Sequence, residues 1–309
     1  MYLDSFGLKK KPFSLTSDPS MLYLTDFHRE ALAALCYGVL ERKGLLLLLG
    51  HAGTGKTSLL TCAIQRLPPG RVQFAPIINP TNEIKGFLES VLLSFGIRDI
   101  PASRPRRLGL LERHLVQTQM EGKIAVLMVD EAHKLSPKAL EEVRLLSNLE
   151  QSSEKLLQIV LAGQNEMRAL LNRADCVQLK QRVALRVTLR TLTPSEVGPY
   201  IGHRWLRASG NQRTPFTVPA VEMIARLSHG VPRVVNVICD NALLAAFGER
   251  SETVETAHVI QSCIELDLTE APAETAADTE LPPRKLPSDA RRVADSPPFS
   301  QRNKWAAGG

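Results

Sequence analysis

The sequence contains no apolar run of 18 or more residues, the length that a membrane-spanning helix needs. Its first residues, Met1 to Phe6, lack the basic segment followed by an apolar stretch that marks a signal peptide. The five cysteines are scattered and form no C-x-x-C pair, so neither a disulfide framework nor a zinc or redox motif is indicated. These absences predict a cytoplasmic protein whose thiols are reduced and packed, with no membrane span.

The 309-residue chain has a net charge of +6, which permits a polyanionic partner. Acidic and basic residues balance from Glu270 onward, so the excess lies earlier in the chain. Three arginines, Arg104, Arg106 and Arg107, are the centre of its densest basic cluster. Because Pro101 and Pro105 interrupt any helix there, we expect an exposed loop that contacts DNA phosphates. The alternative is a solvated basic loop without a ligand.

The segment from Gly50 to Thr57 matches the phosphate-binding pattern G-x-x-x-x-G-K-[ST] at every fixed position. An apolar run over residues 45–49 precedes it and a helical segment over residues 58–66 follows, which is the strand–loop–helix setting that this chemistry needs. Glycines let backbone N–H groups approach phosphate oxygens, Lys56 would reach the β- and γ-phosphates, and the Thr57 hydroxyl would hold Mg²⁺. The pattern therefore predicts ATP and Mg²⁺ as ligands. The expected cradle comprises Gly50, His51, Ala52, Gly53, Thr54, Gly55, Lys56, Thr57 and Ser58.

An apolar segment over residues 124–129 ends in two carboxylates, Asp130 and Glu131. Adjacent acids at the end of a buried strand are costly unless they are used. We expect Asp130 to hold Mg²⁺, directly or through water, and Glu131 to orient and deprotonate the attacking water. Gln164, just past the apolar segment over residues 156–161, is a candidate for contact with the γ-phosphate or the water. The alternative for Gln164 is an ordinary loop residue.

Two arginines are further candidates. Arg182 precedes a predicted strand and could act as a finger on the γ-phosphate of a neighbouring subunit, with Arg186 and Arg190 as competitors and a solvated side chain as the alternative. Arg233 lies in the first turn of a predicted helix that begins at Pro232. Because a cation is disfavoured at a helix N-terminus, its position suggests a phosphate partner, although Asp240 is a competing one.

Strands and helices alternate before Leu192, which predicts an α/β fold with a parallel sheet. After Leu192 only helices are expected, and after Leu268 the composition predicts disorder, with Phe299 and Trp305 marking a docking motif. The expected domains are an N-terminal segment (1–24), an α/β core (25–192), a helical lid (193–268) and a tail (269–309). Besides residues 45–49, the expected strands cover 72–77, 124–129, 156–161 and 184–189. The expected helices cover 27–42, 58–66, 83–95, 108–120, 136–149, 165–171, 218–227, 232–248 and 256–268, with one more starting at Thr193 as cap.

Residues 130–133 also read D-E-A-H, a helicase-like motif. A helicase of that class needs two α/β domains and only one fits here, so this interpretation is rejected and His133 is expected at the surface.

With these motifs in place, the chain resembles an AAA+ ATPase, and more closely the ExeA/GspA-type family of the general secretion pathway and its transposition relatives. The resemblance covers about residues 1–268 and implies a five-stranded core of order 5-1-4-3-2 with a C-terminal helical lid. It further implies Gln164 as sensor 1, Arg182 as a finger acting in trans and Arg233 as sensor 2. The supporting segments are Met1-Tyr2-Leu3, Phe6-Gly7-Leu8, Lys11-Pro12-Phe13, Leu22-Tyr23-Leu24, His28-Arg29-Glu30-Ala31-Leu32, Leu161-Ala162-Gly163-Gln164, Gln181-Arg182-Val183-Ala184-Leu185-Arg186 and Gly230-Val231-Pro232-Arg233.

Secretion-type members usually continue into a membrane span and a peptidoglycan-binding domain, and neither is visible here. We therefore expect an ATP-hydrolysing regulator of transposition or integration that forms rings or filaments on duplex DNA and engages a transposase or target selector. A cytoplasmic secretion-assembly ATPase without DNA binding is the alternative, and a regulatory nucleotide switch is a third.

Overall fold

The computed structural model describes residues 2–268 except 17, 79, 81–83 and 152–153. The expectations for Glu83 and for the tail, with Phe299 and Trp305, lie outside these residues. The described chain forms two compact units. One is an α/β unit of residues 26–52 and 59–189, and the other is a helical unit made of the chain up to Thr25, Gly53–Ser58 and the chain from Arg190 onward.

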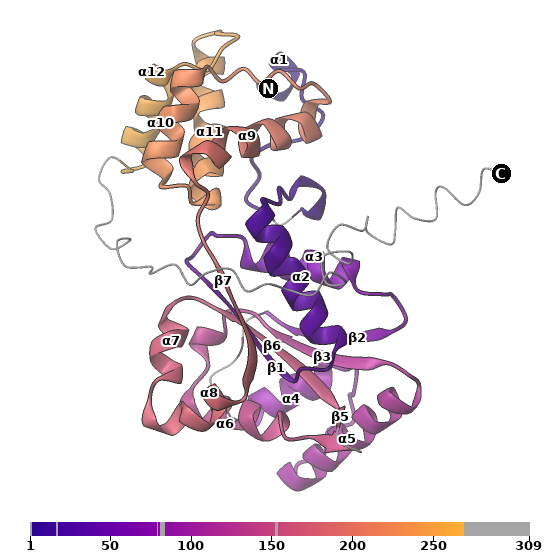
Figure 1. Ribbon diagram of the computed structural model, residues 1–309. Coiled ribbons are helices and arrows are strands. Elements are labelled where there is room, and N and C mark those ends of the chain that lie inside the picture. Colours follow the sequence, from indigo (N-terminus) through magenta and orange to yellow (C-terminus); the bar gives the residue numbers. More distant parts are fainter. Residues whose placement is uncertain (1, 17, 79, 81–83, 152–153, 269–309) are drawn as a thin grey trace, which may run out of the picture. The chain divides into compact units, whose positions relative to one another are not determined.

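The α/β unit is built on a five-stranded sheet of order β2-β3-β6-β1-β7 (Figure 1). All four strand pairings are parallel, and the order matches the expected 5-1-4-3-2 with these strands numbered along the chain. The strands are β1 (Leu45–Gly50), β2 (Val72–Ile77), β3 (Ile124–Val129), β6 (Leu157–Gly163) and β7 (Val183–Leu189). The sheet thus confirms the predicted α/β class.

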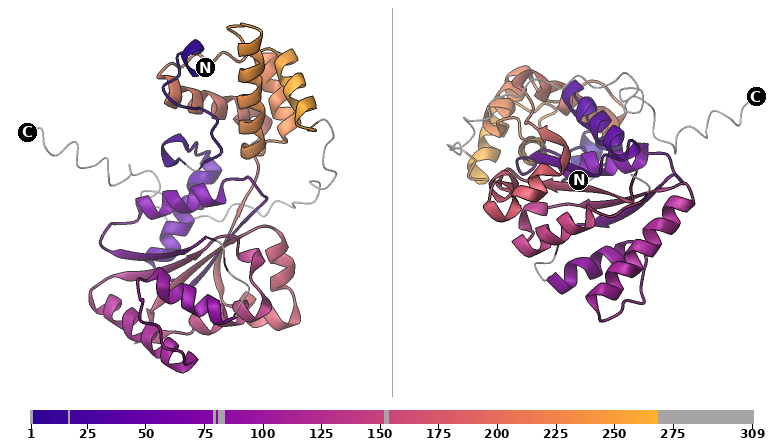
Figure 2. Two further views of the ribbon diagram at one scale, coloured as in Figure 1. Left: turned by 180° about the vertical axis from the view of Figure 1, so that it is seen from behind. Right: turned by 60° about the horizontal axis from the view of Figure 1, so that its bottom comes forward.

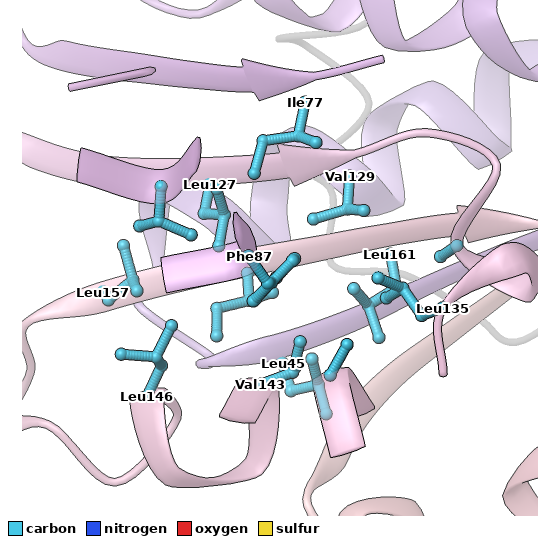
Figure 3. Packing of buried hydrophobic residues seen from close by; sticks show 14 of the residues in the cluster. Leu45, Ile77, Phe87, Leu127, Val129, Leu135, Val143, Leu146, Leu157 and Leu161 are labelled. Carbon is cyan, nitrogen blue, oxygen red and sulfur yellow. The ribbon is translucent and has the colours of Figure 1, made fainter. Parts of the chain in front are cut away.

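The interior strand β1 is buried over its whole length, as its run of five leucines predicts. Successive side chains point to opposite faces of a sheet, so Leu45, Leu47 and Leu49 enter one apolar cluster while Leu46 faces α2 (Asp26–Leu40). Phe87 belongs to the same cluster, together with side chains from β1, β3 and β6 (Figure 3). Apolar side chains therefore cover the sheet on both faces, and this packing holds the strands and their ends in place.

The other elements of this unit mostly follow the expected ranges. An addition that sequence patterns did not indicate is a short hairpin, β4 (Glu150–Gln151) with β5 (Glu154–Lys155). The helices are α3 (Lys56–Arg66, its first residues in the helical unit), α4 (Ile84–Ser94), α5 (Arg104–Met120), η2 (Ala132–Lys134), α6 (Pro137–Leu146), α7 (Glu166–Leu171), η3 (Ala174–Cys176) and α8 (Val177–Gln181).

The start of α5 corrects one prediction. The sequence predicts a loop for residues 104–107, but they form the first turn of a helix. Pro105 is the second residue of this helix. The N–H groups of the first turn have no acceptor within the helix, so a proline there removes no helical hydrogen bond.

The helical unit contains α9 (Pro194–Ser209), α10 (Val218–Ser228), α11 (Pro232–Gly248) and α12 (Thr256–Glu265), seen with α1 (Tyr2–Ser5) in Figure 2. As expected, Thr193 is the N-cap of α9. The Glu196 side chain accepts a hydrogen bond from the Thr193 backbone N–H, which completes a capping box. The Arg190 guanidinium binds the Glu196 carboxylate at 2.7 and 2.9 Å and holds the pKa of that carboxyl at about 2.

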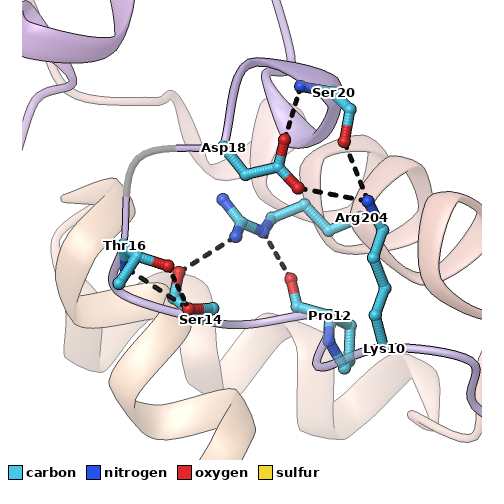
Figure 4. A network of polar contacts seen from close by, with 7 residues as sticks. All are labelled: Lys10, Pro12, Ser14, Thr16, Asp18, Ser20 and Arg204. Carbon is cyan, nitrogen blue, oxygen red and sulfur yellow. Dashed lines mark hydrogen bonds and ion pairs between the residues drawn. The ribbon is translucent and has the colours of Figure 1, made fainter.

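A buried arginine attaches the N-terminal segment to α9. Arg204 donates through Nε to the Pro12 carbonyl at 2.7 Å and through Nη2 to the Ser14 carbonyl at 3.1 Å (Figure 4). Lys10 and Ser20 both contact Asp18, which closes the adjacent turn, containing η1 (Pro19–Met21). Side-chain donors thereby order a stretch in which sequence patterns indicated no regular structure.

Candidate nucleotide site

The loop between β1 and α3 has the backbone that a phosphate cradle requires. Gly53 and Gly55 have φ values of +78° and +93°, in the left-handed region that favours glycine. A Cβ added to Gly55 would meet nothing within 4 Å, so the loop is open beside it. Lys56 starts α3 and is buried, with 6% of its surface exposed, whereas Thr57 is exposed. An open glycine turn at a helix N-terminus fits a phosphate group.

Within the helical unit, this loop touches the start of α11. The Arg233 N–H donates to the Gly53 carbonyl at 3.3 Å. A Cβ on Gly53 would lie 2.8 Å from Arg233 Cβ and 3.1 Å from Val231 Cγ1. The structure thus brings Arg233 to the phosphate loop. Asp240, the competing partner, instead accepts a hydrogen bond from the Tyr2 hydroxyl at 2.6 Å.

In the α/β unit, three strands end at one edge of the sheet. β1, β6 and β3 are parallel neighbours, so the start of the phosphate loop, Gln164 and Asp130 all follow strand ends on that edge. Asp130 is buried, donates its N–H to the Ile77 carbonyl at 2.9 Å and accepts the N–H of Glu131 at 2.9 Å. A carboxylate is a hard oxygen donor of the kind that Mg²⁺ prefers, and the hydroxyl of Thr57, in the helical unit, is another such donor. Across the described chain, no group of three or more His, Cys, Asp or Glu side chains forms a metal cage.

Glu131 has a strained backbone, with φ of 54° and ψ of 33°. Left-handed geometry is uncommon for a residue other than glycine and is characteristic of functional sites. Its Oε2 lies 3.4 Å from Lys134 Nζ and 3.6 Å from His133 Nε2, and 29% of its side chain is exposed. The carboxylate is therefore partly accessible and faces two nitrogen groups.

The structure corrects the expectation for His133, which is not a surface residue. Its side chain is only 14% exposed, and its Nδ1 accepts the backbone N–H of Gln164 at 3.3 Å. His133 thus joins the two residues predicted to act on water and γ-phosphate, Glu131 and Gln164. Sequence reasoning misses this because the contact depends on the pairing of β3 with β6. The D-E-A-H pattern is the available signal, but it is set aside together with the helicase interpretation.

A second histidine contact joins two loops of the same edge. His51 Nε2 lies 3.0 Å from Asn165 Nδ2, which links the residue after β1 to the residue after Gln164. Nothing in the sequence singles out Asn165, since an asparagine at the start of a helix is ordinary.

Arg182 caps the C-terminus of α8 immediately before β7 and is half-buried. Hydrogen bonds from Arg144 and Lys155 lower the pKa of the Glu141 and Glu150 carboxyls, and the Arg182 charge lowers both further. Its competitor Arg186 is exposed on β7, whereas Arg190 is already paired with Glu196. A role for Arg182 in trans stays a prediction.

Two of the three arginines expected to contact DNA have partners within the chain. Arg104 binds both Glu142 oxygens at 3.0 and 2.8 Å, and only 6% of the Glu142 side chain is exposed. Arg107 donates to the Pro101 carbonyl at 2.7 Å and lies 3.3 Å from Glu89. Arg104 is nevertheless exposed and Arg107 is half-buried, and a contact of either arginine with DNA stays a prediction.

Comparisons with known proteins agree with this architecture. Residues 39–171 match the family model described as an AAA domain. General secretion pathway protein A of Aeromonas hydrophila is 40% identical over 255 residues, 82% of this chain. The chain is an AAA+ protein of the ExeA/GspA type. It spans 46% of that relative's length.

Solved structures show the same fold at low identity. The Cdc6p of Pyrobaculum aerophilum has a TM-score of 0.68 and 19% identity, with 84% of this chain and 71% of that chain covered. The ORC2 protein of Aeropyrum pernix, solved as ADPNP–ADP complexes, has a TM-score of 0.65 and 16% identity, with 86% and 74% covered. In the described part of this chain, no helix has the length and apolar character needed to cross a bilayer.

Proposed function

We propose that this AAA+ protein binds ATP with Mg²⁺ and hydrolyses it. The observation that carries the proposal is one edge of the parallel sheet, where a phosphate loop follows β1 and a buried aspartate and a strained glutamate follow β3. ATP fits the open glycine turn, and Mg²⁺ bound through Thr57 and Asp130 would neutralise charge on the transferred phosphoryl group.

In this proposal each side chain has a separate task. Lys56 pairs with the phosphates, and Glu131 takes the proton of the attacking water. Gln164 orients the water or the γ-phosphate. Arg233, at the start of α11 and beside Gly53, responds to the bound phosphates from the helical unit.

Two substitutions test these tasks. Lys56→Ala should lose ATP binding, measured with a fluorescent ATP analogue, because its charge is removed from the cradle. Glu131→Gln should bind ATP normally and lose turnover by roughly 10²- to 10⁴-fold, because the amide cannot accept a proton. Glu121→Gln, an exposed glutamate in the same unit, is the matched control. Near wild-type turnover by Glu131→Gln would contradict the assignment of the base.

We further propose that the active form is an oligomer in which Arg182 acts on a neighbour's nucleotide. Mixing inactive Arg182→Ala with inactive Glu131→Gln should restore part of the activity, because some interfaces then combine an intact arginine with an intact glutamate. Mixed oligomers must be verified by differential tagging. No recovery in them would assign Arg182 to another role.

Duplex DNA remains the proposed macromolecular partner, but we now place its site on the face of α5 that carries Arg106 and Arg113. Arg106 and Arg113 lie on one face of that helix beside a shallow cleft of about 630 Å³, which Gly109 and Leu110 also line. Arg106 makes no ion pair or hydrogen bond to another described side chain, and Arg113 donates only to the Gly109 carbonyl of its own helix. Seven residues of helix separate the two Cα atoms by about 10 Å along the helix axis, so the two arginines can neutralise different phosphates.

The double variant Arg106→Ala/Arg113→Ala should weaken DNA binding and flatten its salt dependence by about 0.9 log units for each phosphate that is no longer neutralised. Arg29→Ala/Arg173→Ala is the charge-matched control, because each of these arginines pairs with a nearby aspartate. Equal effects of the two double variants would exclude α5 as the DNA site.

A secretion-assembly ATPase without DNA binding is the second candidate, favoured by the 40% identity to general secretion pathway protein A. Wild-type protein that shows no DNA binding with ATP present would support it. A transposase or target selector as partner stays a prediction from the sequence.

A further inference from the structure

Three side chains at the sheet edge form a connected group. Glu131 follows β3, Gln164 follows β6, and the ring of His133, from the short helix η2, contacts both. The backbone of η2 packs closely on the end of β6, because a Cβ added to Gly163, the last residue of that strand, would lie only 3.2 Å from the His133 backbone nitrogen. A larger residue at position 163 would therefore require η2 to shift by a few tenths of an ångström.

The hydrogen bond to Nδ1 determines where the ring carries its proton. A backbone N–H can only donate, so Nδ1 must accept and carries no hydrogen. The neutral ring therefore bears its proton on Nε2. This nitrogen lies 3.3 Å from the Gln164 side-chain nitrogen and 3.6 Å from Glu131 Oε2.

With this tautomer, His133 Nε2–H would face the NH₂ group of Gln164, so that two donors would meet with no acceptor between them. Amide oxygen and nitrogen are assigned from the hydrogen-bond network, so the arrangement resolves with the Gln164 amide turned over. Its Oε1 then accepts from His133 Nε2–H, and its NH₂ group points away from the ring. An outward NH₂ donor is what an anionic phosphate or a water lone pair requires.

We propose that His133 is a positioning residue for ATP hydrolysis, and this proposal rests on the function assigned above to Glu131 and Gln164. Its Nε2–H turns the Gln164 amide so that the NH₂ faces outward, and it attracts the Glu131 carboxylate from the side. One imidazole thereby sets the orientation of both groups that act on the water. His133 itself contacts no reacting atom.

Three substitutions separate positioning from structural support. His133→Ala removes both ring contacts and should lower kcat by roughly 10- to 100-fold while the Kd for ATP changes less than about twofold. His133→Gln extends an amide towards the Nε2 position and should recover part of kcat. His133→Asn supplies an acceptor only near Nδ1 and should not. His114→Asn, another half-buried histidine of the α/β unit, is the control and should match wild type.

A second measurement does not depend on turnover. In ¹⁵N-labelled protein without nucleotide, the His133 ring should show a protonated Nε2 and an unprotonated Nδ1. Glu131→Gln should shift the Nε2–H resonance, and Gln164→Ala should shift it more, because the amide oxygen is the nearer acceptor. The His114 ring signals should not move in either variant.

Several outcomes would overturn the proposal: a protonated Nδ1, unchanged kcat in His133→Ala, or full recovery by His133→Asn, which would indicate support of the Gln164 backbone alone. Failure of the underlying function looks different. Wild-type protein would then hydrolyse no ATP, or Glu131→Gln would remain active, while the ring resonances would still test whether His133 contacts Glu131 and Gln164.

Discussion

The contact between the phosphate loop and α11 gives the sharpest test of the structure, through Gly53→Ala. Two costs add in this variant. An alanine at φ of +78° has an unfavourable left-handed backbone, worth roughly 1–2 kcal/mol. Its Cβ would also lie 2.8 Å from Arg233 Cβ, a first side-chain carbon that cannot rotate away, and such overpacking costs about 1–3 kcal/mol.

The same loop provides a matched control in Gly55→Ala. Gly55 has φ of +93°, so alanine meets a similar backbone cost, but the added Cβ would have no neighbour within 4 Å. We therefore expect a loss of about 2–5 kcal/mol in the free energy of unfolding for Gly53→Ala and about 1–2 kcal/mol for Gly55→Ala.

The assay is urea unfolding without nucleotide, followed by circular dichroism. Omitting ATP matters, because both glycines belong to the proposed cradle and ligand binding would add its own stabilisation. If Gly55→Ala destabilises the protein as much as Gly53→Ala, the close packing of the phosphate loop on Arg233 is not present in solution.

Further variants probe three individual contacts. The pKa of Glu196 is lowered to about 2, so its charge stabilises the fold above about pH 4.5 and this is lost as the pH falls towards 2; Glu196→Gln should be less stable than wild type by about 1 kcal/mol at pH 7, with the difference vanishing near pH 2 in urea titrations. Arg104→Ala should lower the free energy of unfolding by about 1–3 kcal/mol, because it leaves the buried Glu142 carboxylate without that partner, whereas Arg106→Ala should change it by less than about 0.5 kcal/mol. Arg204→Leu removes both hydrogen bonds to the N-terminal segment, so limited proteolysis before residue 25 should accelerate, and an unchanged cleavage rate would show that other contacts hold the segment.

Local chemistry determined much of the site. A glycine-rich turn after an apolar strand specifies a phosphate loop, since few other residues reach φ values near +80°. Acids after a buried apolar segment specify the end of a strand, because charges are costly further in. Because such signals are local, the strand positions, the capping box at Thr193 and the placement of Asp130 and Gln164 after strands could be predicted from the sequence.

Tertiary structure decided what these residues touch. The arginines of α5 look alike in the sequence, yet Arg104 binds a buried glutamate while Arg106 has no such partner, because only the packed fold brings Glu142 next to one of them. His133 is equally ambiguous, since a histidine three residues after an aspartate can be solvated or buried. Hydrogen bonding between β3 and β6 places the two strand ends side by side, and that pairing of distant segments turns a polar residue into the link between Glu131 and Gln164.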